Sequence, residues 1–293
     1  MASTMTASRF KSAWRLVSAA LGLTALLTAC TNSAPAYQIP DELEFSFRWS
    51  AEPGIGLTSD AAIIARAYME SAFISYRTDR HGWPMAMPSK YSYPGYAAAS
   101  PETGDHYIRG DGLSMAYLEP PSTRTVGTFY AQLLELKTDD STQPGVPQTT
   151  PPTWNATMCV WVDGLDLKSS PADKDPFNGQ YHPFVNVSGA GTLPDGGRTV
   201  RLTMQQPPSG QPTRLSAGEG PARYPTTDVF GDWKITEAKM TDPGTNSPGE
   251  QNLCADRPDN PVPAALRGRD SRTESDVPAP TLDPYPGWPG SKQ

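Results

Sequence analysis

Apolar and polar residues alternate along residues 43–49. The apolar positions fall two residues apart, at Leu43, Phe45, Phe47 and Trp49. Successive side chains of a β-strand point to opposite faces of a sheet, so a period of two buries one face and leaves the other polar. The stretch therefore predicts a short, half-buried strand.

The apolar spacing then lengthens to that of a helix. Thr58, Ser59 and Asp60 are all residues that cap helix N-termini. The apolar positions that follow are three and four residues apart, at Ile63, Ile64, Ala67, Tyr68, Ala72 and Phe73. This pattern predicts the clearest helix of the chain, which begins after the cap and ends near Thr78.

The remaining pattern predicts strands. Residues 79–123 are rich in Pro, Gly and Tyr and are irregular, with one short helix around Tyr93–Ser100. Beyond them, segments rich in β-branched and aromatic residues are separated by Pro, Gly or Asp clusters, which is typical of strands. These segments are 125–137, 157–167, 183–193, 198–205 and 229–240. The Pro-Asp-Gly-Gly sequence at 194–197 predicts a hairpin between the third and the fourth.

One N-terminal helix followed by a run of strands indicates the α+β class. We predict that the helix packs on a curved antiparallel sheet of about five strands. A β-sandwich is the alternative, because the strand count alone would allow it.

The first 29 residues have the parts of an export signal. Arg9, Lys11 and Arg15 are basic, and no acidic residue precedes Cys30. The apolar run 16–27 is about twelve residues long, whereas a membrane-crossing helix needs about twenty. Residues 1–29 are therefore predicted to be a cleaved signal peptide.

The end of this signal, Leu27-Thr28-Ala29-Cys30, resembles the lipobox of bacterial lipoproteins. The resemblance implies that Cys30 carries acyl chains such as palmitate and that cleavage occurs just before it. Two or three chains on one Cys would anchor the protein stably. The expected location is the extracytoplasmic face of the cell membrane, with the lipid as the attachment. An ordinary secretory signal with a chance Cys is the alternative.

Composition divides the rest of the chain. Residues 30–41 form a polar tether, and 42–254 are long enough for one α+β ectodomain with its own core. Residues 255–293 hold many Pro and charges of both signs, with few clustered apolar residues. Such a segment buries too little surface to offset the entropy of ordering, which predicts a disordered tail.

Charge argues against nucleic acid as a partner. The signal segment holds three of the 24 basic residues and none of the 31 acidic ones, so residues 30–293 carry a net charge of −10. Phosphate backbones are bound by basic surfaces, and an acidic domain is a poor match for them.

Cysteine usage predicts a disulfide. With Cys30 acylated, Cys159 and Cys254 remain as a pair in an oxidising compartment, where disulfides persist. A two-thiolate metal site is the rival, but the three His are scattered and the Cys spacing is not that of a zinc finger. We expect no metal and no cofactor.

Catalytic motifs are not apparent, and no catalytic residue is assigned. A hydrolase elbow of the Gly-x-Ser-x-Gly type does not occur. His81 and His106 lie in loop-like sequence, and Arg109-Gly110-Asp111 is typical of a tight turn. The pair Asp163 and Asp166 brackets a glycine, as in turns where Asp bonds its own backbone.

Aromatic residues are the most suggestive feature for binding. They gather in one irregular stretch at Trp83, Tyr91, Tyr93, Tyr96 and Tyr107. Aromatic side chains on loops can form the wall of a ligand site. The interpretation we favour is that they cover the helix and the open side of the sheet.

Three segments of the chain resemble parts of the nuclear transport factor two-like fold. The residues concerned are Ala61–Tyr76 as first helix, Gly127–Tyr130 opening a long strand and Phe230–Ile235 as closing strand. Arg66–Ser71 with Tyr93–Tyr96 also resembles uncharacterised actinobacterial lipoproteins. The resemblance implies a helix in the concavity of a curved sheet, with a pocket at its mouth. The candidate ligand-binding residues are Tyr68, Trp83, Tyr93, Tyr96 and Trp233.

The combined prediction is a membrane-anchored, non-enzymatic module that binds an envelope protein or a small apolar ligand. An enzyme that uses the same cavity is the alternative, and it would need Asp105 and His106 to face one pocket. A structural envelope protein whose tail contacts the cell wall is a third hypothesis.

Overall fold

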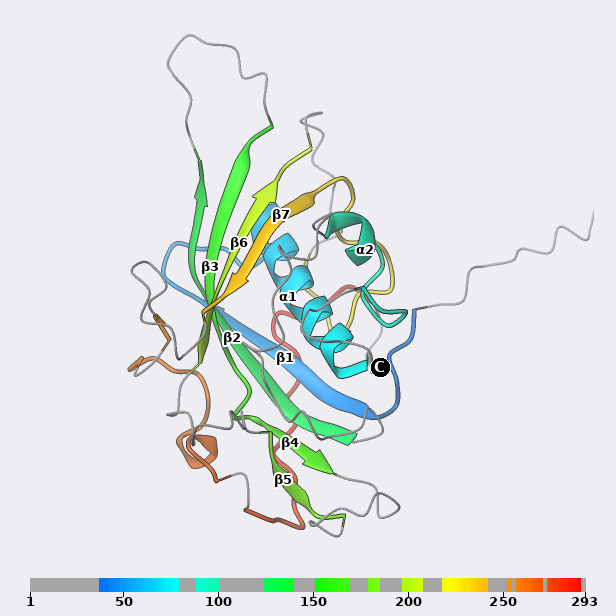
Figure 1. Cartoon of the computed structure of the whole chain (residues 1–293), viewed down its shortest axis with the longest axis vertical. Coiled ribbons are helices and arrows are strands. Elements are labelled where there is room, and N and C mark those ends of the chain that lie inside the picture. Colours follow the sequence, from blue (N-terminus) through cyan, green and yellow to red (C-terminus); the bar gives the residue numbers. More distant parts are fainter. Residues whose placement is uncertain are drawn as a thin grey trace, which may run out of the picture. The chain divides into compact units, whose positions relative to one another are not determined.

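The computed structural model describes residues 37–78, 88–100, 124–139, 151–168, 179–184, 197–207, 218–241, 252–254, 257–270 and 273–290. They belong to one compact unit that begins at Tyr37 (Figure 1). The signal segment with Cys30, and also Trp83, lie outside these residues. Within them, no helix combines the length and the apolarity that crossing a membrane requires.

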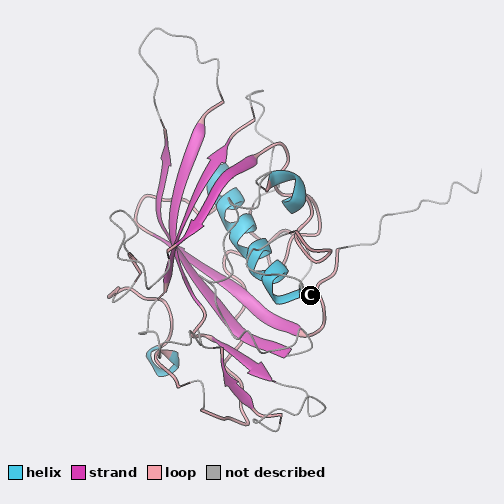
Figure 2. Ribbon diagram, viewed as in Figure 1, coloured by secondary structure: helices cyan, strands magenta, loops and turns pink. Residues whose placement is uncertain are grey.

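The described strands form one mostly antiparallel sheet (Figure 2). They are β1 (Leu43–Ala51), β2 (Arg124–Thr138), β3 (Thr153–Trp161), β4 (Leu165–Lys168), β5 (Tyr181–Pro183), β6 (Arg198–Gln205) and β7 (Lys234–Met240). Their order is β5-β4-β2-β3-β6-β7, with β1 paired to β2. With helix α1 (Asp60–Thr78) against one face, the described part of the chain is an α+β domain, as predicted, and its strands do not make a two-sheet sandwich.

The first strand confirms the alternating pattern and adds a parallel pair. β1 runs parallel to β2, from Leu43 opposite Thr125 to Ala51 opposite Leu133. Parallel strands need a crossover connection, and α1 lies in the connection between these two. Helix and first strand are therefore coupled by topology as well as by packing.

Two predicted strand assignments are wrong. The segment 157–167 is not one strand, because β3 ends at Trp161 and β4 begins at Leu165, and both pair with β2. Within the described residues the third and fourth predicted strands are not paired, since β5 pairs with β4 whereas β6 pairs with β3 and β7. Turn-forming residues indicate a reversal of the chain, but the buried face of the sheet decides which strands pair. Residues 185–196 lie outside the described part.

The core lies between α1 and the sheet. The helix is buried over almost its whole length, and Phe73 sits at the centre of an aromatic cluster with Phe45, Phe47 and Phe129. Its ring centroid is 4.7 Å from that of Phe129 and 5.2 Å from that of Phe45. The short helix expected around 93–100 is present as α2 (Tyr96–Ala99).

The expectation of a disordered C-terminal tail is wrong for the residues that the structure describes. We call the described residues between 252 and 290 the C-terminal strap, and they contact the rest of the domain at successive points. Cys254 is bonded to β3, Ser275 pairs with β5, and the amide of Ala279 donates to Asp166 on β4 (2.6 Å). Tyr285 then pairs with β1, and Trp288 is buried beside α1.

The strap crosses the face of the sheet opposite to α1. Phe45 and Phe47 point toward the helix, so Ser46 between them points to the other face. Ser46 donates to the carbonyl of Leu282 (2.5 Å), and the amide of Leu282 donates to Thr128 Oγ1 (3.0 Å). The strap thus passes from the outer face around the edge of β1 to the helix side. Backbone and hydroxyl bonds hold it, which a search for clustered apolar residues does not detect.

Candidate functional site

Glu70 on α1 is the centre of a buried polar cluster. Its Oε1 accepts a hydrogen bond from Trp49 Nε1 (2.7 Å). Its Oε2 accepts one from the Tyr93 hydroxyl (2.7 Å) and one from Trp288 Nε1 (2.8 Å). A carboxylate only accepts hydrogen bonds, and three donors from β1, the 88–100 segment and the strap are directed at it.

Arg66 lies one helical turn before Glu70 and binds three carbonyl oxygens. Its guanidinium donates to Gly218 (2.8 Å), to Leu57 (3.1 Å) and to Pro286 of the strap (2.6 Å). It also lies over the indole of Trp288, 4.8 Å from the ring centroid. Arg66 and Glu70 together therefore hold residues 286–288 against α1.

The pKa values of this cluster follow from its burial. Desolvation raises the pKa of the Glu70 carboxyl, while Arg66 and the hydrogen bonds from Tyr93, Trp288 and Trp49 act in the opposite direction. Desolvation lowers the pKa of Arg66 and raises that of Tyr93 well above its ordinary value. Burial is thus the largest influence on all three groups.

The sequence-predicted binding residues lie in this interior. Tyr68, Tyr93, Tyr96 and Trp233 are each at most 2% exposed, and none of them borders the open groove described below. Tyr68 and Tyr96 stack with their ring centroids 5.2 Å apart, and Tyr93 meets Trp288 edge to face at 5.9 Å. The mouth expected between helix and sheet is filled by these rings and by the strap.

An open groove lies at the C-terminal end of β1. Its volume is about 480 Å³, within the range of about 300–1,000 Å³ that is usual for ligand sites. The lining comes from the end of β1, the loop before α1, the 218–220 turn and the strap. The residues are Trp49, Ser50, Ala51, Ile55, Leu57, Thr58, Glu219, Tyr285 and Pro286.

The path of the strap explains why this groove is open. Tyr285 pairs with β1, but Pro286 turns its carbonyl to Arg66, and Gly287 packs against the backbone of 220–222. A Cβ on Gly287 would lie 2.1 Å from the Gly220 carbonyl oxygen, so only glycine permits this approach. Trp288 then exchanges two backbone hydrogen bonds with Ala222 (2.8 and 3.0 Å). The strap thereby leaves β1 and opens the space between them.

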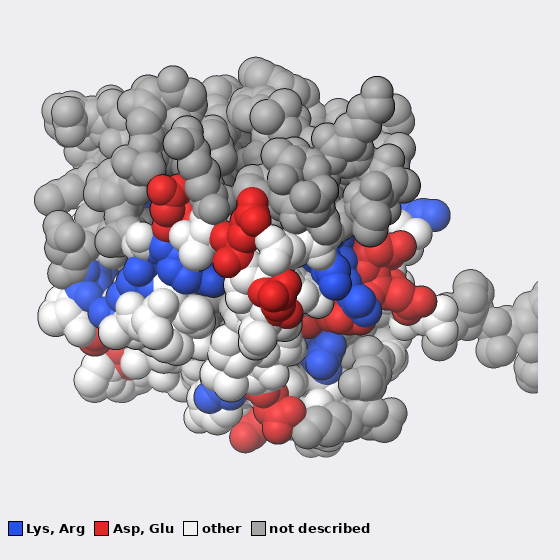
Figure 3. Space-filling view, turned by 90° about the horizontal axis from the view of Figure 1, so that it is seen from below, with Lys and Arg blue, Asp and Glu red and all other residues white. Residues whose placement is uncertain are grey.

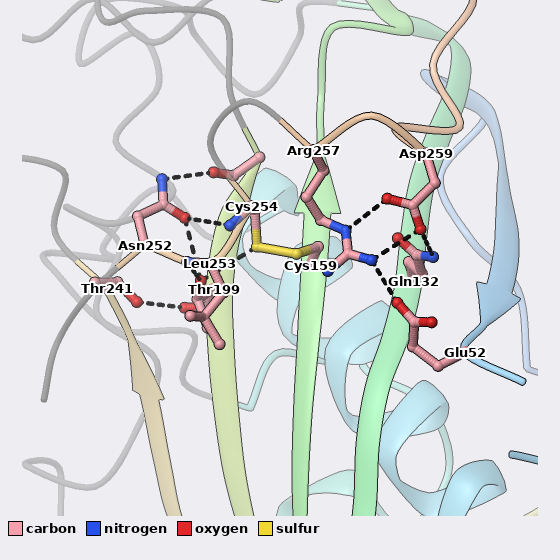
Figure 4. The surroundings of a disulfide bond; sticks show 11 residues. Glu52, Gln132, Cys159, Thr199, Thr241, Asn252, Leu253, Cys254, Arg257 and Asp259 are labelled. Atoms are coloured by element: carbon pink, nitrogen blue, oxygen red, sulfur yellow. Dashed lines mark hydrogen bonds and ion pairs between the residues drawn. A yellow bond between two sulfur atoms is a disulfide. The ribbon is translucent and has the colours of Figure 1, made fainter.

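The predicted disulfide is present and anchors the start of the strap. Cys159 on β3 and Cys254 are bonded, with Cα atoms 5.5 Å apart, a usual separation for a disulfide. In Figure 4 the bridge lies between two polar groups. On one side Thr199 donates to Asn252 Oδ1 (3.1 Å), and on the other Arg257 binds Asp259.

The Arg257 group ties the strap to β2 and to the end of β1. Arg257 forms ion pairs with Glu52 and Asp259, and Gln132 donates to Asp259 Oδ2 (2.7 Å). The hydrogen bond from Arg257, together with the one from Gln132, lowers the pKa of Asp259 from 3.8 to about 2. Further along the strap, a guanidinium nitrogen of Arg269 lies 2.7 Å from Oδ1 of Asp166, and this carboxylate is buried. Asp166 on β4 therefore binds the strap through Arg269 and through the amide of Ala279.

Other chemistry is sparse in the described residues. Among them, no group of three or more His, Cys, Asp or Glu is arranged to hold a metal ion. Acidic and basic side chains are interspersed on the face that Figure 3 shows, with uncharged surface between them. His81, Asp105, His106 and the Arg109–Asp111 turn lie outside the described part.

Sequence reasoning missed the Arg66–Glu70 cluster. The signal was present, because two opposite charges four residues apart interrupt a helix face that is otherwise apolar. Such a pair on a buried helix indicates ionic partners within the core. The partner Trp288, in contrast, had no local signal.

We compared the chain with protein-family models, with curated proteins and with solved structures, and none of them matches it.

Proposed function

We propose that this protein is a lipid-anchored, extracytoplasmic binding module without catalytic activity, whose binding site is the groove at the end of β1. The domain is nuclear transport factor two-like in this proposal. A helix against one face of a mostly antiparallel sheet supports that relation, and the lipobox at Cys30 supports the anchor.

The observation that carries the proposal is the closed interior. The concavity that would house a substrate is occupied by Tyr93, Tyr96 and Trp288, and the Glu70 carboxyl is saturated by three donors from the protein itself. The groove, in contrast, is open, and its lining combines apolar and aromatic side chains with polar groups. Binding at the groove, and not chemistry in the concavity, is what this arrangement supports.

The disulfide supports the proposed extracytoplasmic location. Cys159 and Cys254 close a long loop and would be kept reduced in a cytosol, whereas disulfides persist outside it. The acidic net charge argues against adhesion to anionic lipid by charge, so the lipid on Cys30 is the proposed attachment.

The anchor is tested by intact mass of the full-length chain, expressed in a bacterium and extracted from its membranes. Loss of residues 1–29 together with added acyl mass is expected for the parent and for Cys159→Ser. The Cys30→Ala variant should lack the acyl mass. An unacylated parent would overturn the anchor.

The binding site is tested by photo-crosslinking in the same cells. A photoreactive phenylalanine replaces Thr58, which is exposed and lines the groove, or Val277, which is 73% exposed on the strap. Adducts from position 58 and none from position 277 are expected. Equal yields, or none at position 58, would contradict binding at the groove.

A further inference from the structure

We propose that the groove binds an extended peptide with a basic side chain, which adds to β1 in parallel immediately beyond Tyr285. This inference rests on the proposed function and names the partner of its binding site. It is carried by the backbone of β1, by the path of the strap and by the charge of the lining.

The backbone argument starts from the strap itself. The amide of Tyr285 donates to the carbonyl of Phe47 (3.1 Å), and the amide of Trp49 donates to the carbonyl of Tyr285 (2.6 Å). This is the pattern of a parallel ladder, in which both backbone groups of every second residue face the same edge. The outer edge of β1 therefore already accepts one residue of an extended chain.

The pairing of the strap with β1 ends at Tyr285, although β1 continues to Ala51. Two residues further along, a continuing strand would donate an amide to the carbonyl of Trp49 and accept a hydrogen bond from the amide of Ala51. Both of these β1 groups face the same edge. The strap does not supply that residue, because Gly287 lies against 220–222 and Trp288 pairs with Ala222. Among the described residues, no backbone group bonds to these two positions. Both belong to residues that line the groove.

Peptide addition to a strand edge needs open backbone groups and neighbouring pockets for side chains. The main chain of the peptide supplies the hydrogen bonds, and pockets beside the edge select its side chains. The groove borders the open edge directly, and Ile55, Leu57 and Pro286 provide apolar surface for a side chain. β1 ends at Ala51, so the edge that is available is short.

Charge selects the side chain. Among the described lining residues, Glu219 carries the one charge, and its side chain is exposed. Two cations lie nearby. Arg66 interacts electrostatically with the buried Glu70 and with Glu219, and Arg48 donates to the carbonyl of Asp283 (2.7 Å). A lysine or arginine of the peptide would meet the Glu219 carboxylate at the rim, whereas an acidic residue would be repelled.

The test uses the full processed protein in detergent and defined peptides. The probe is acetyl-Val-Lys-Val-amide, and the comparison probes are the same peptide with Glu for Lys, with N-methylated backbone amides, and n-butylamine alone. Affinity is measured by calorimetry, and the site by the NMR shift of the Ala51 amide.

The Lys peptide is expected to bind and to move the Ala51 amide. We expect at least tenfold weaker binding for the Glu peptide, for the N-methylated peptide and for n-butylamine. Glu219→Gln should weaken binding of the Lys peptide about five- to tenfold and spare the fold, because its side chain is exposed.

Other outcomes separate the two proposals. Equal binding of the methylated and unmethylated peptides would overturn strand addition, and equal binding of n-butylamine would reduce the site to a cation site. If no peptide binds while position 58 still crosslinks in cells, the inference fails and the proposed function stands. If the Lys peptide binds but position 58 gives no adduct, no partner occupies the groove in cells, and the proposed function fails together with the inference that rests on it.

Discussion

The indole Nε1 of Trp288 donates a hydrogen bond to Oε2 of Glu70 across 218 residues of sequence (2.8 Å). This contact joins the last described turn of the chain to the centre of its main helix. Because the same carboxylate also binds Trp49 and Tyr93, one side chain connects the first strand, the helix and the C-terminal strap. The strap is consequently part of the folded core.

Replacing Trp288 by alanine should lower the free energy of unfolding by about 3–5 kcal/mol, as is usual when a buried tryptophan is truncated. Trp288 is 1% exposed, packs on Tyr93 and lies under Arg66. Urea unfolding followed by circular dichroism measures the loss. The matched control is Val277→Ala on the same strap, which should change stability by less than about 0.5 kcal/mol. Equal effects of the two changes would show that the strap does not stabilise the domain.

Glu70→Ala should destabilise by about 3–5 kcal/mol, because it leaves Arg66 buried without its counter-charge and three donors without an acceptor. The control is Glu219→Gln, an exposed carboxylate near the same arginine. Thermal and urea unfolding of both variants provide the comparison. A Glu70 variant as stable as the Glu219 variant would contradict the role of the buried cluster.

Acid should weaken the domain through Asp259. Its pKa is about 2 in the folded protein, below the ordinary 3.8, so the unfolded chain binds this proton first as the pH falls. The stabilisation from the Arg257–Asp259 pair is therefore complete above about pH 4 and is lost between about pH 4 and pH 2. Asp259→Asn should flatten the dependence of stability on pH in that window.

Arg257→Gln serves as the control for this pH effect. It removes the largest cause of the lowered Asp259 pKa, so it should flatten much of the same window, and the double variant should add little to the Asp259 change. Unfolding free energies measured at steps between pH 2 and 5 test this. A single Asp259 variant with the parent's pH dependence would refute the assignment.

The Cys159–Cys254 bridge should contribute several kcal/mol. The two residues are 95 positions apart, and closing a loop of that length is worth about 4–5 kcal/mol in the chain-entropy view. The Cys159→Ser, Cys254→Ser double variant should show a clearly lower Tm. Reductant should lower the Tm of the parent and leave that of the double variant unchanged. If reductant added to partly unfolded parent protein leaves its Tm unchanged, that result would count against the bridge.

The local features of this protein could be predicted from sequence. Alternation of apolar residues at 43–49 and helical spacing after Asp60 predict β1 and α1, because both patterns follow from the geometry of one element against one buried face. The cysteine pair was likewise predictable, since two thiols in an oxidising compartment have few other partners. Residues 125–137, rich in β-branched and aromatic side chains, match β2 closely.

Tertiary structure alone decided which strands pair, that the strap is ordered and where the open groove lies. Strand pairing depends on contacts between segments far apart, and the turn sequence at 194–197 carries no information about them. The strap is ordered by single contacts, such as Trp288 with Glu70, Ala279 with Asp166 and Tyr285 with β1, each between residues more than 100 positions apart. A composition rule averages over neighbours in sequence and reads such a segment as disordered. The sequence determined which elements form, and the folded chain determined that the C-terminal strap packs against α1 and leaves the end of the β1 edge open.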